Sequence, residues 1–529
     1  MTSKQFDVAG TADLRDGEMK QFPAGDTSVL VARINGNYHA VAATCTHYGA
    51  PLAEGVLNSD RIVCPWHHAC FNATTGDLLE PPALDSLEHY ELTIKDERIL
   101  VAIPEGSQGR RVPDMTAPDP ASDKRVFVIL GAGAAGYSAV QTLRGEGFRG
   151  RIVLITREDR LPYDRPNLSK DYLQGHAEPE WMPLRPDEFF DEHKIEVLSG
   201  KEVTRVDAGT RTISFKDSEK LSYDALLIAT GGVPRTLKIP GSDLKNILTL
   251  RSFDDSDAII AATNGAKHVV IIGASFIGME GAASLKSRGV EVTVVAPGKT
   301  PFETTLGPEI GALFKDLHEK NGVQFKLGAK IVRFTGSGAV DGIEIDSGEK
   351  IAADLVLVGV GVRPATDFLN GVNLNKDGSI VVDKYLRAAS DLYAAGDVAS
   401  FPSAYTGEQQ RIEHWRTALQ QGRIAALNMA GKETPYASVP FFWTQQFEST
   451  LRYVGHASGW DEIIVDGNIA SQDFVAFFIK NDRALAVASM NRDQPMAAIE
   501  ELMREARMPS AKDLKASPVD FVEKLHRSV

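Results

Sequence analysis

The sequence predicts a multidomain protein, in which a small all-β domain is followed by an α/β part with two dinucleotide-binding domains and by a C-terminal α+β domain. Three observations support this order. The 529 residues are too many for one hydrophobic core. Short alternating apolar runs fill residues 1–103, whereas strand-like and helix-like patterns alternate from residue 125 onward. An apolar strand, a glycine turn and an amphipathic helix also occur twice, beginning at residues 126 and 269.

The composition is that of an ordinary globular protein, with 43% apolar and 24% charged residues. The net charge of −14 argues against a nucleic-acid or anionic-membrane partner, because both need a basic surface. No run of eighteen apolar residues and no apolar N-terminal segment is present. Three Cys leave no disulfide framework. We therefore expect a cytoplasmic protein without a membrane span.

The first domain carries the most specific motif of the chain, Cys45-x-His47 followed by Cys64-x-x-His67, in two loops that also contain Gly and Pro. Two loops that each offer a thiolate and an imidazole match the ligands of a two-iron, two-sulfur cluster in which His replaces Cys on one iron. The spacing closely resembles that of the Rieske family. Structural zinc is the alternative, although Cys-x-His is tighter than the usual zinc-finger spacing.

Cys70 and His68 lie close to this motif and are not predicted to be ligands. Cys70 is the one other Cys of the chain, so it has no partner for a disulfide, and we predict a small buried apolar residue. His68 stands where the Rieske motif usually has Gly, and we interpret it as a loop residue and not as a fifth ligand.

Residues 104–124 are predicted to be a linker, because four Pro occur there among Gly, Ser and Asp. An extended Pro-rich segment at about 3 Å per residue would span on the order of 60 Å. Such a tether would let the first domain swing between an electron donor and an acceptor.

The first glycine motif follows the strand 126–130 and predicts a dinucleotide site. Its members are Gly131, Gly133 and Gly136. These glycines allow close approach of the backbone, and the helix N-terminus accepts the pyrophosphate. Glu158, after the next strand, is the acid expected to bind ribose hydroxyls, and Arg157 or Asp159 could take that position instead.

Two later segments, 223–232 and 392–397, resemble signatures of the flavoproteins with two dinucleotide-binding domains. The resemblance implies FAD, bound in part by Ala229, Thr230, Gly231, Gly396 and Asp397. The segment 161–170 resembles the ferredoxin-reductase and apoptosis-inducing-factor group, in which Arg165 and Lys170 would lie beside the isoalloxazine. No Cys-x4-Cys follows the first glycine motif, which excludes the disulfide-reductase branch.

The second glycine motif, Gly273, Ser275 and Gly278, is predicted to bind the nicotinamide nucleotide. By the same resemblance Glu280 pairs with Lys170, and these two are the predicted catalytic residues; a solvated helix charge is the alternative for Glu280. Gly361 lies in a segment, 359–364, that resembles the one passing the nicotinamide and returning to the FAD domain.

The choice between NADH and NADPH stays open, with a slight preference for NADH from the subfamily. Ala296 follows the strand 291–295, where proteins specific for NAD usually have an acid. No Arg stands there to indicate NADP, and the nearby Lys299 is ambiguous.

Two aromatic segments complete the predicted flavin site. Glu413, His414 and Trp415 begin a helix that resembles the one whose N-terminus approaches the flavin pyrimidine ring. Trp443 opens a C-terminal domain that resembles the interface domain of the same group. Both Trp residues would cover the flavin edge, with a place in the hydrophobic core as the alternative for each.

The predicted order of domains is a Rieske domain (1–103), a linker (104–124), an FAD domain in two parts (125–245 and 367–432), an NAD(P)H domain (246–366) and an interface domain (433–529).

The predicted function is electron transfer from NAD(P)H through FAD and the 2Fe-2S cluster to an external acceptor such as an oxygenase, through an exposed edge at His47 and His67. One alternative is an interaction protein of the apoptosis-inducing-factor type that responds to NADH. Another is an electron-input module like that of nitrite reductase, for which three Cys are too few to bind siroheme as well. The acceptor and the oligomeric state, a homodimer included, stay open.

Overall fold

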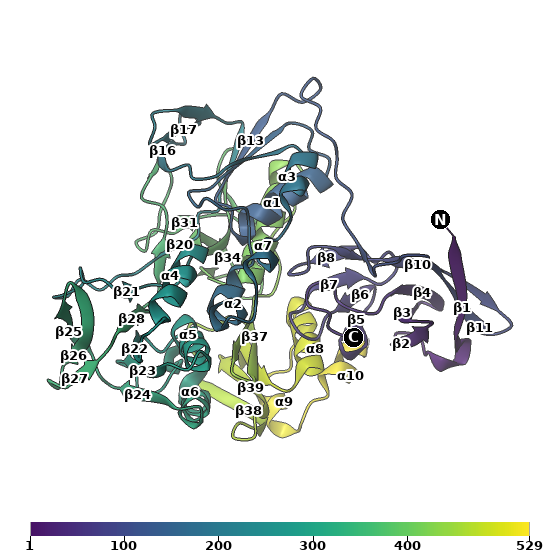
Figure 1. Ribbon diagram of the computed structural model, residues 1–529. Coiled ribbons are helices and arrows are strands. Elements are labelled where there is room, and N and C mark those ends of the chain that lie inside the picture. Colours follow the sequence, from purple (N-terminus) through teal and green to yellow (C-terminus); the bar gives the residue numbers. More distant parts are fainter. Residues whose placement is uncertain (1, 528–529) are drawn as a thin grey trace.

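The computed structural model describes residues 2–527. The N-terminal domain is all-β, as predicted, and lies beside the larger α/β body (Figure 1). Its six-stranded antiparallel sheet contains β1 (Ser3–Gly10), β11 (Arg98–Pro104), β10 (His89–Lys95), β4 (Asn37–Ala42), β3 (Thr27–Ile34) and β2 (Met19–Ala24), in this order. A smaller sheet contains β5 (Val56–Asn58), β6 (Arg61–Val63), β7 (Cys70–Asn72) and β8 (Leu78–Glu80). The loop after β4 and the loop between β6 and β7 carry the four predicted cluster ligands.

The predicted linker is bound to both of its neighbours and does not form a free tether. Within it β12 (Arg110–Arg111) pairs with β9 (Ser86–Leu87) of the first domain. Farther along, the backbone amides of Thr116 and Asp119 each donate to carbonyl oxygens of the FAD domain at 2.9 Å. The segment thus finds backbone partners on both sides, which holds it against the surface.

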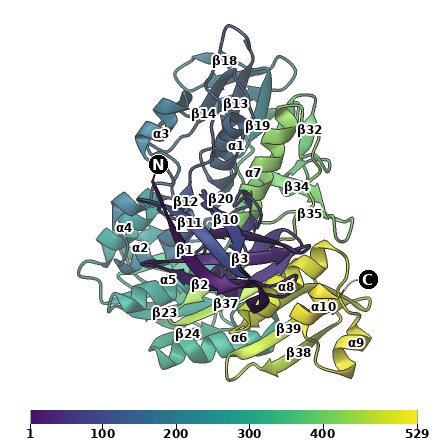
Figure 2. The same ribbon diagram turned by 90° about the vertical axis from the view of Figure 1, so that its right-hand side faces the viewer.

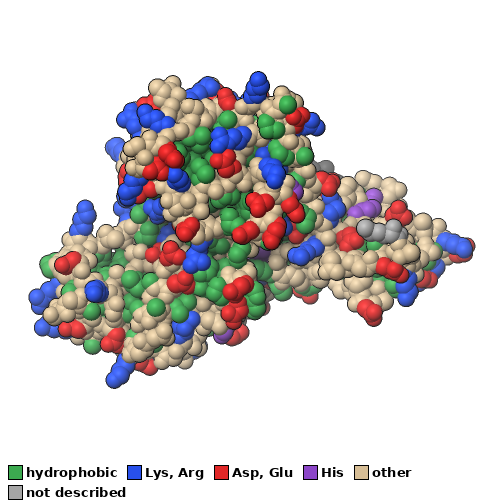
Figure 3. Space-filling view, turned by 45° about the horizontal axis from the view of Figure 1, so that its top comes forward, with side chains coloured by type: hydrophobic (Ala, Val, Ile, Leu, Met, Phe, Trp, Pro, Cys, Tyr) green, Lys and Arg blue, Asp and Glu red, His purple; other side chains and the backbone are tan. Residues whose placement is uncertain are grey.

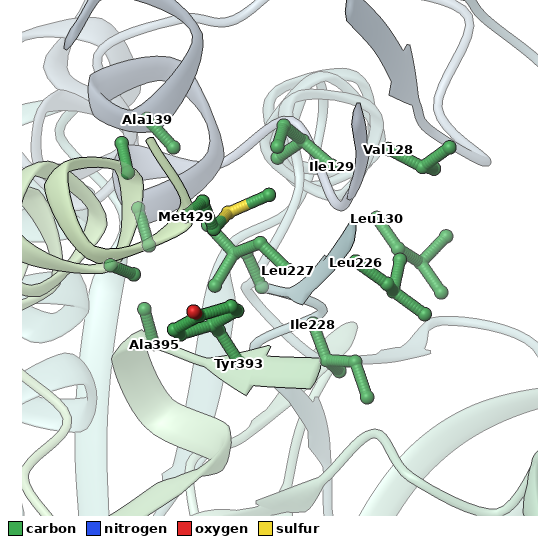
Figure 4. Packing of buried hydrophobic residues seen from close by; sticks show 14 of the residues in the cluster. Val128, Ile129, Leu130, Ala139, Leu226, Leu227, Ile228, Tyr393, Ala395 and Met429 are labelled. Carbon is green, nitrogen blue, oxygen red and sulfur yellow. The ribbon is translucent and has the colours of Figure 1, made fainter. Parts of the chain in front are cut away.

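The FAD domain is a doubly wound α/β unit. Its six-stranded sheet has the order β15 (Ile195–Leu198), β14 (Arg151–Ile155), β13 (Val126–Leu130), β19 (Ala225–Ile228), β33 (Leu392–Ala394) and β32 (Arg387–Ala389), with β32 alone antiparallel. Its helices are α1 (Ala134–Gly145), α2 (Asp171–Gln174), α3 (Asp187–Glu192) and α7 (Trp415–Met429). Figure 4 shows the apolar side chains of β13, β19 and β33 packed against those of α1 and α7. These three central strands carry no charged residue because helices and loops cover both faces of the sheet.

The NAD(P)H domain repeats this plan around a five-stranded parallel sheet. The order is β21 (Ile247–Leu248), β28 (Leu355–Val358), β22 (His268–Ile272), β23 (Glu291–Ala296) and β24 (Val323–Leu327). Its helices are α4 (Phe253–Thr263), α5 (Phe276–Ser287) and α6 (Glu303–Lys320), and a small sheet contains β25 (Ile331–Ser337), β26 (Ala339–Ile345) and β27 (Lys350–Ala352). The chain enters and leaves this domain through an antiparallel pair, β20 (Gly232–Pro234) and β29 (Val362–Pro364).

Short strands complete the FAD domain. They are β16 (Val203–Asp207), β17 (Thr212–Phe215), β18 (Lys220–Ser222) and β30 (Leu369–Asn370) in one sheet, and β31 (Ile380–Val381), β34 (Ala399–Pro402) and β35 (Gln409–Gln410) in another.

The C-terminal domain is α+β, as predicted, and joins the first domain to the rest. Its antiparallel sheet has the order β36 (Phe441–Gln446), β37 (Ser449–Gly455), β40 (Arg483–Met490), β39 (Asp473–Lys480) and β38 (Glu462–Asn468), followed by α8 (Asp493–Arg504), α9 (Ala511–Ala516) and α10 (Phe521–His526). Helices α8 and α10 lie against β5 (Figure 1). Figure 2 shows the C-terminal helices below the strands of the first domain. Val56, Val63 and Cys70 of the first domain share one hydrophobic core with Phe441 and Ile499. Cys70 is fully buried, as predicted.

The surface agrees with the composition. Lys and Arg side chains are interspersed with Asp and Glu on the face shown in Figure 3. No helix within residues 2–527 is both long enough and apolar enough to cross a membrane.

Candidate functional site

The four predicted cluster ligands come together at the tips of two loops. Cys45 and Cys64 are buried and their thiols hydrogen-bond to each other, which together with burial raises the pKa of Cys45. The Nδ1 atoms of His47 and His67 face each other at 3.3 Å. The donors thus form one pair of thiols and one pair of imidazoles, as two separately ligated irons require. This donor set fits a Rieske cluster.

The protonation of the two imidazoles agrees with this assignment. Burial lowers the pKa of His47 to about 4 and also lowers the pKa of His67. Both rings are therefore neutral near pH 7, the form in which imidazole binds a metal. Among residues 2–527, no three His, Cys, Asp or Glu side chains are arranged around a single metal-ion position.

The imidazole edge predicted to be exposed is partly covered, and both His47 and His67 are half-buried. The Tyr48 ring stacks on His47 with ring centroids 4.0 Å apart, and its hydroxyl donates to Asp164 of the FAD domain. The Trp443 ring lies 4.4 Å from that of His67. The edge is partly covered because the first domain packs against both the FAD domain and the C-terminal domain, which the spacing within two short loops could not reveal.

A cavity of about 430 Å³ lies where the two nucleotide domains meet β36. Most of the residues predicted to bind FAD or the nicotinamide nucleotide line it. They are Gly133, Arg165, Lys170, Ala229, Gly231, Ser275, Glu280, Gly361, Gly396, Asp397, Glu413, His414, Trp415 and Trp443. The predicted residues outside its lining are Gly131, Gly136, Glu158, Thr230, Gly273 and Gly278. Segments far apart in sequence therefore form one cleft.

The glycines of the first motif have two different roles. Gly131 has a φ of +114°, and a Cβ there would lie 2.2 Å from the carbonyl oxygen of Ala229. A Cβ on Gly136 would lie 1.8 Å from the carbonyl oxygen of Gly131. Gly133, in contrast, has open space around it and lines the cavity. Two glycines therefore permit the turn, and the third leaves room for a ligand at the helix N-terminus.

The second motif repeats this geometry. A Cβ on Gly273 would lie 2.3 Å from the carbonyl oxygen of Gly359, and one on Gly278 would lie 2.2 Å from that of Gly273. Ser275 occupies the open position and lines the cavity. The replacement of Gly by Ser thus falls at the one position of the three that tolerates a side chain.

Glu158 lies half-buried at the end of β14, beyond the cavity lining. It accepts hydrogen bonds from the Tyr163 hydroxyl at 2.5 Å and from Arg165 Nη2 at 3.0 Å. Burial alone would raise its pKa, but the charge of Arg165 and the hydrogen bonds from Tyr163 and Arg165 together outweigh burial, so the pKa of Glu158 is lowered. Arg157 and Asp159, the alternatives, are exposed. Glu158 is thus a charged acceptor held in a fixed orientation.

The predicted pairing of Lys170 with Glu280 is present. Lys170 Nζ lies 2.8 Å from Glu280 Oε2, and the Glu280 side chain is only 4% exposed. Ser169 also donates to this carboxylate, and Thr444 of β36 donates to its other oxygen at 2.7 Å. This burial excludes the alternative of a solvated helix charge for Glu280. The pair lines the cavity directly before the wall formed by β36.

Arg251 belongs to the cavity but was missed by the sequence analysis. Its Nη2 donates to Asp397 Oδ2 at 2.6 Å, and its carbonyl oxygen accepts from Arg165 at 2.7 Å. Burial would lower the pKa of Arg251, but the charge and hydrogen bond of Asp397, with the charge of Glu413, together outweigh burial and raise it. Arg251 precedes α4, outside every recognisable motif, so no local pattern could have identified it.

Trp443 connects the two cofactor regions. It lines the 430 Å³ cavity, and it also lines a second cavity of about 260 Å³ together with His67. Lys170 is the other predicted site residue in both linings. Trp415 likewise lines the larger cavity, so both Trp residues lie at the cleft. The cluster loop and the flavin-sized cleft are therefore separated by the thickness of one strand.

Comparisons with known proteins agree with this geometry. The family model "Pyridine nucleotide-disulphide oxidoreductase" matches residues 125–422, "Rieske [2Fe-2S] domain" matches residues 4–91, and "Reductase C-terminal" matches residues 441–524. Apoptosis-inducing factor 3 of Homo sapiens is 39% identical over 94% of this chain and 84% of its own length. Rhodocoxin reductase of Rhodococcus erythropolis is 35% identical over 75% of this chain and 93% of its own length. The putidaredoxin reductase–putidaredoxin complex has a TM-score of 0.71 at 30% identity, covering 76% of this chain and 98% of the matched one.

Proposed function

The chain belongs to the pyridine nucleotide-disulphide oxidoreductase family and carries a Rieske domain, and we propose that it passes electrons internally, from NAD(P)H at the cleft to its own cluster and then to an external acceptor. It is an oxidoreductase that uses NAD(P)H, FAD and a 2Fe-2S cluster. The observation that carries the proposal is Trp443, which lines the cleft on one side and contacts His67 on the other. FAD, once bound, accepts two electrons as a hydride and releases them singly.

The residues of the cleft bind and orient the nucleotides in this proposal. The turn at Gly133 and the N-terminus of α1 accept the FAD pyrophosphate, and Glu158 accepts from ribose hydroxyls. Asp397, held by Arg251, faces the same cavity. Ser275 at the start of α5 occupies the equivalent place for the nicotinamide nucleotide.

The Lys170–Glu280 pair is proposed to act on the reacting part of the flavin. Lys170 is a cation close to the cluster-facing wall of the cleft, and a nearby cation favours the anionic reduced form of flavin. Glu280 holds that ammonium in place through a buried contact. The two side chains thus set the charge at the point where electrons leave the cleft.

The external acceptor is proposed to be an oxygenase or a similar redox partner. Relatives include the ferredoxin reductase subunit of a benzene 1,2-dioxygenase system, 32% identical over 71% of this chain. The N-terminal domain of the present chain would take the place of a separate iron–sulfur protein. The match to apoptosis-inducing factor 3 covers all domains and supports a second candidate, an interaction protein that responds to NADH with slow turnover.

We also propose the predicted domain boundaries and a cytoplasmic location. Strand β11 ends at Pro104 and β13 begins at Val126, close to the boundaries predicted for the linker. The three Cys lie in one domain as buried free thiols, which agrees with a reducing compartment.

An anaerobic titration tests the function. NADH and, separately, NADPH are added to iron-loaded protein, while visible absorption follows the flavin and electron paramagnetic resonance follows the cluster. We expect flavin bleaching followed by the reduced-cluster signal, and rapid turnover with a one-electron acceptor. The variant Cys64→Ser is the control, because it removes one iron ligand that is not part of the cleft lining, and its flavin should bleach without the cluster signal.

A bleached flavin with no cluster signal in the fully loaded wild-type protein would contradict internal transfer. A long-lived reduced flavin with slow turnover would instead favour the interaction protein.

A further inference from the structure

His68 has a backbone conformation that normally belongs to glycine. Its φ is +57°, in the left-handed region, and its side chain is fully buried. In the Rieske motif that this loop resembles, glycine usually occupies the position and adopts this conformation without strain. A buried side chain in such a conformation persists only where its surroundings hold it.

The surroundings of His68 come from the C-terminal domain. Its Nδ1 hydrogen-bonds to the carboxylate of Glu500 on α8, and this nitrogen is the donor because a carboxylate only accepts. Its ring stacks on Phe441 of β36, with centroids 4.1 Å apart and an angle of 25° between the planes. The residue next to a cluster ligand is therefore fixed by another domain.

Arg416 binds the same loop from the FAD domain. Its Nη2 donates to the carbonyl oxygen of His68 at 2.8 Å, and its Nη1 donates to Glu500 at 2.7 Å. Further bonds reach Glu80 and the carbonyl oxygen of Pro81. Burial would lower the pKa of Arg416, but Glu500 and Glu80 outweigh burial and raise it, so the guanidinium stays charged.

Arg416 also links this contact to the flavin cleft. It is the second residue of α7, and the first residue, Trp415, lines the cavity. Trp415 thus faces the cleft, and the next residue, Arg416, faces the loop that carries His67. A fixed helix end holds both in one geometry.

We infer that His68, Glu500 and Arg416 form an interdomain latch that keeps the cluster loop docked on the flavin-binding helix, so that the first domain works in place and does not swing on the linker. The functional meaning of the latch rests on the proposed internal transfer. The three are positioning residues that fix the distance between the cluster loop and the cleft.

Cys70 reports on the latch without any need for turnover. This thiol is fully buried in the core shared by the two domains, and the other two Cys are cluster ligands in the proposal. Its rate of alkylation by iodoacetamide, located by peptide mass spectrometry in the full-length loaded protein, measures how often the domains separate. Cluster and flavin spectra verify that both cofactors stay bound.

The variants His68→Gly and Glu500→Gln should both speed alkylation of Cys70. The loss of a hydrogen bond to a charged group corresponds to a rise of about 10- to 100-fold in the separated population. His68→Gly suits the local backbone, so it removes the side chain without straining the loop. Glu500→Gln lies outside the cluster loops and serves if the first variant loses its cluster. Glu462→Gln is the matched control and should label like the wild type, because this side chain on β38 is 42% exposed and pairs only with Lys515 among the described residues.

A second measurement connects the latch to electron transfer. In rapid-mixing experiments with NADH, flavin reduction should keep its wild-type rate in both variants, while the reduced-cluster signal should appear more slowly. Wild-type labelling rates in both variants, or rapid labelling already in the wild type, would overturn the latch. A wild-type cluster that NADH never reduces would overturn the proposed function instead, and the labelling result would still decide the latch.

Discussion

The clearest prediction about the free energy of unfolding concerns the buried ion pair of Lys170 and Glu280. Glu280 is 4% and Lys170 13% exposed, so each charge depends on protein partners and not on water. Lys170→Met leaves the carboxylate with two hydroxyl donors, Ser169 and Thr444. Glu280→Gln leaves the ammonium with the carbonyl oxygen of Pro166 at 3.3 Å. Removing one partner of a buried ion pair costs about 3 kcal/mol, so each variant should lose about that free energy of unfolding.

The double variant should lose much less than the sum, because no buried charge is then left unpaired. We expect a loss of about 4 kcal/mol and a coupling energy of about 2 kcal/mol. Urea titration of the FAD-loaded protein, followed by flavin fluorescence, measures the transition that releases the cofactor. Additive losses, within about 0.5 kcal/mol, would refute the claim that the two side chains stabilise each other.

Three further predictions concern pH and the nucleotide cleft. Burial lowers the pKa of His318 to about 4 from an ordinary 6.5, so folding favours the neutral ring; the contribution is complete above pH 6.5 and is lost as pH falls toward 4, by up to about 3 kcal/mol. His318→Leu should therefore flatten this part of the pH dependence of the free energy of unfolding, and an unchanged slope would contradict the assignment. Gly133→Ala should keep the fold and weaken FAD binding about 10- to 100-fold in a fluorescence titration, whereas Gly136→Ala should destabilise the FAD domain itself. Arg251→Met should weaken FAD binding about 10- to 100-fold, because it leaves the carboxylate of Asp397 without its cation in the cavity, and Arg251→Lys should retain most of the affinity.

Features that depend on local rules could be predicted from the sequence. The glycine turns, the strand–helix repeat and the two cluster loops each have a short pattern with a definite physical reason. The structure brings Lys170 and Glu280 together as the resemblance implied. These predictions succeeded because a turn or a ligand pair is determined by residues close in the chain, or by a motif that already contains the contact.

The contacts between domains were beyond the same reasoning. Arg251 lines the cleft and Thr444 holds Glu280 beside it. Neither position belongs to a motif, and each acts through a partner more than a hundred residues away. The partial cover over the cluster edge was missed for the same reason, since the cover at His67 comes from Trp443. The only local indication of an interdomain contact was His68 in place of glycine. Its role could be recognised only with the C-terminal domain packed against it.

Strand β36 explains why cluster docking and the flavin cleft belong together. Side chains alternate between the two faces of a strand, and residues 441–444 follow this rule. The first and third contact the cluster loop at His68 and His67, with ring centroids 4.1 Å and 4.4 Å apart. The second and fourth point toward α5, where they contact Phe276 at 4.7 Å between ring centroids and Glu280 through a 2.7 Å hydrogen bond. A shift of one residue in the register of this strand would exchange both sets of contacts at once. One strand therefore supports the cluster on one side and the reacting end of the cleft on the other, so the two sites can only be positioned together.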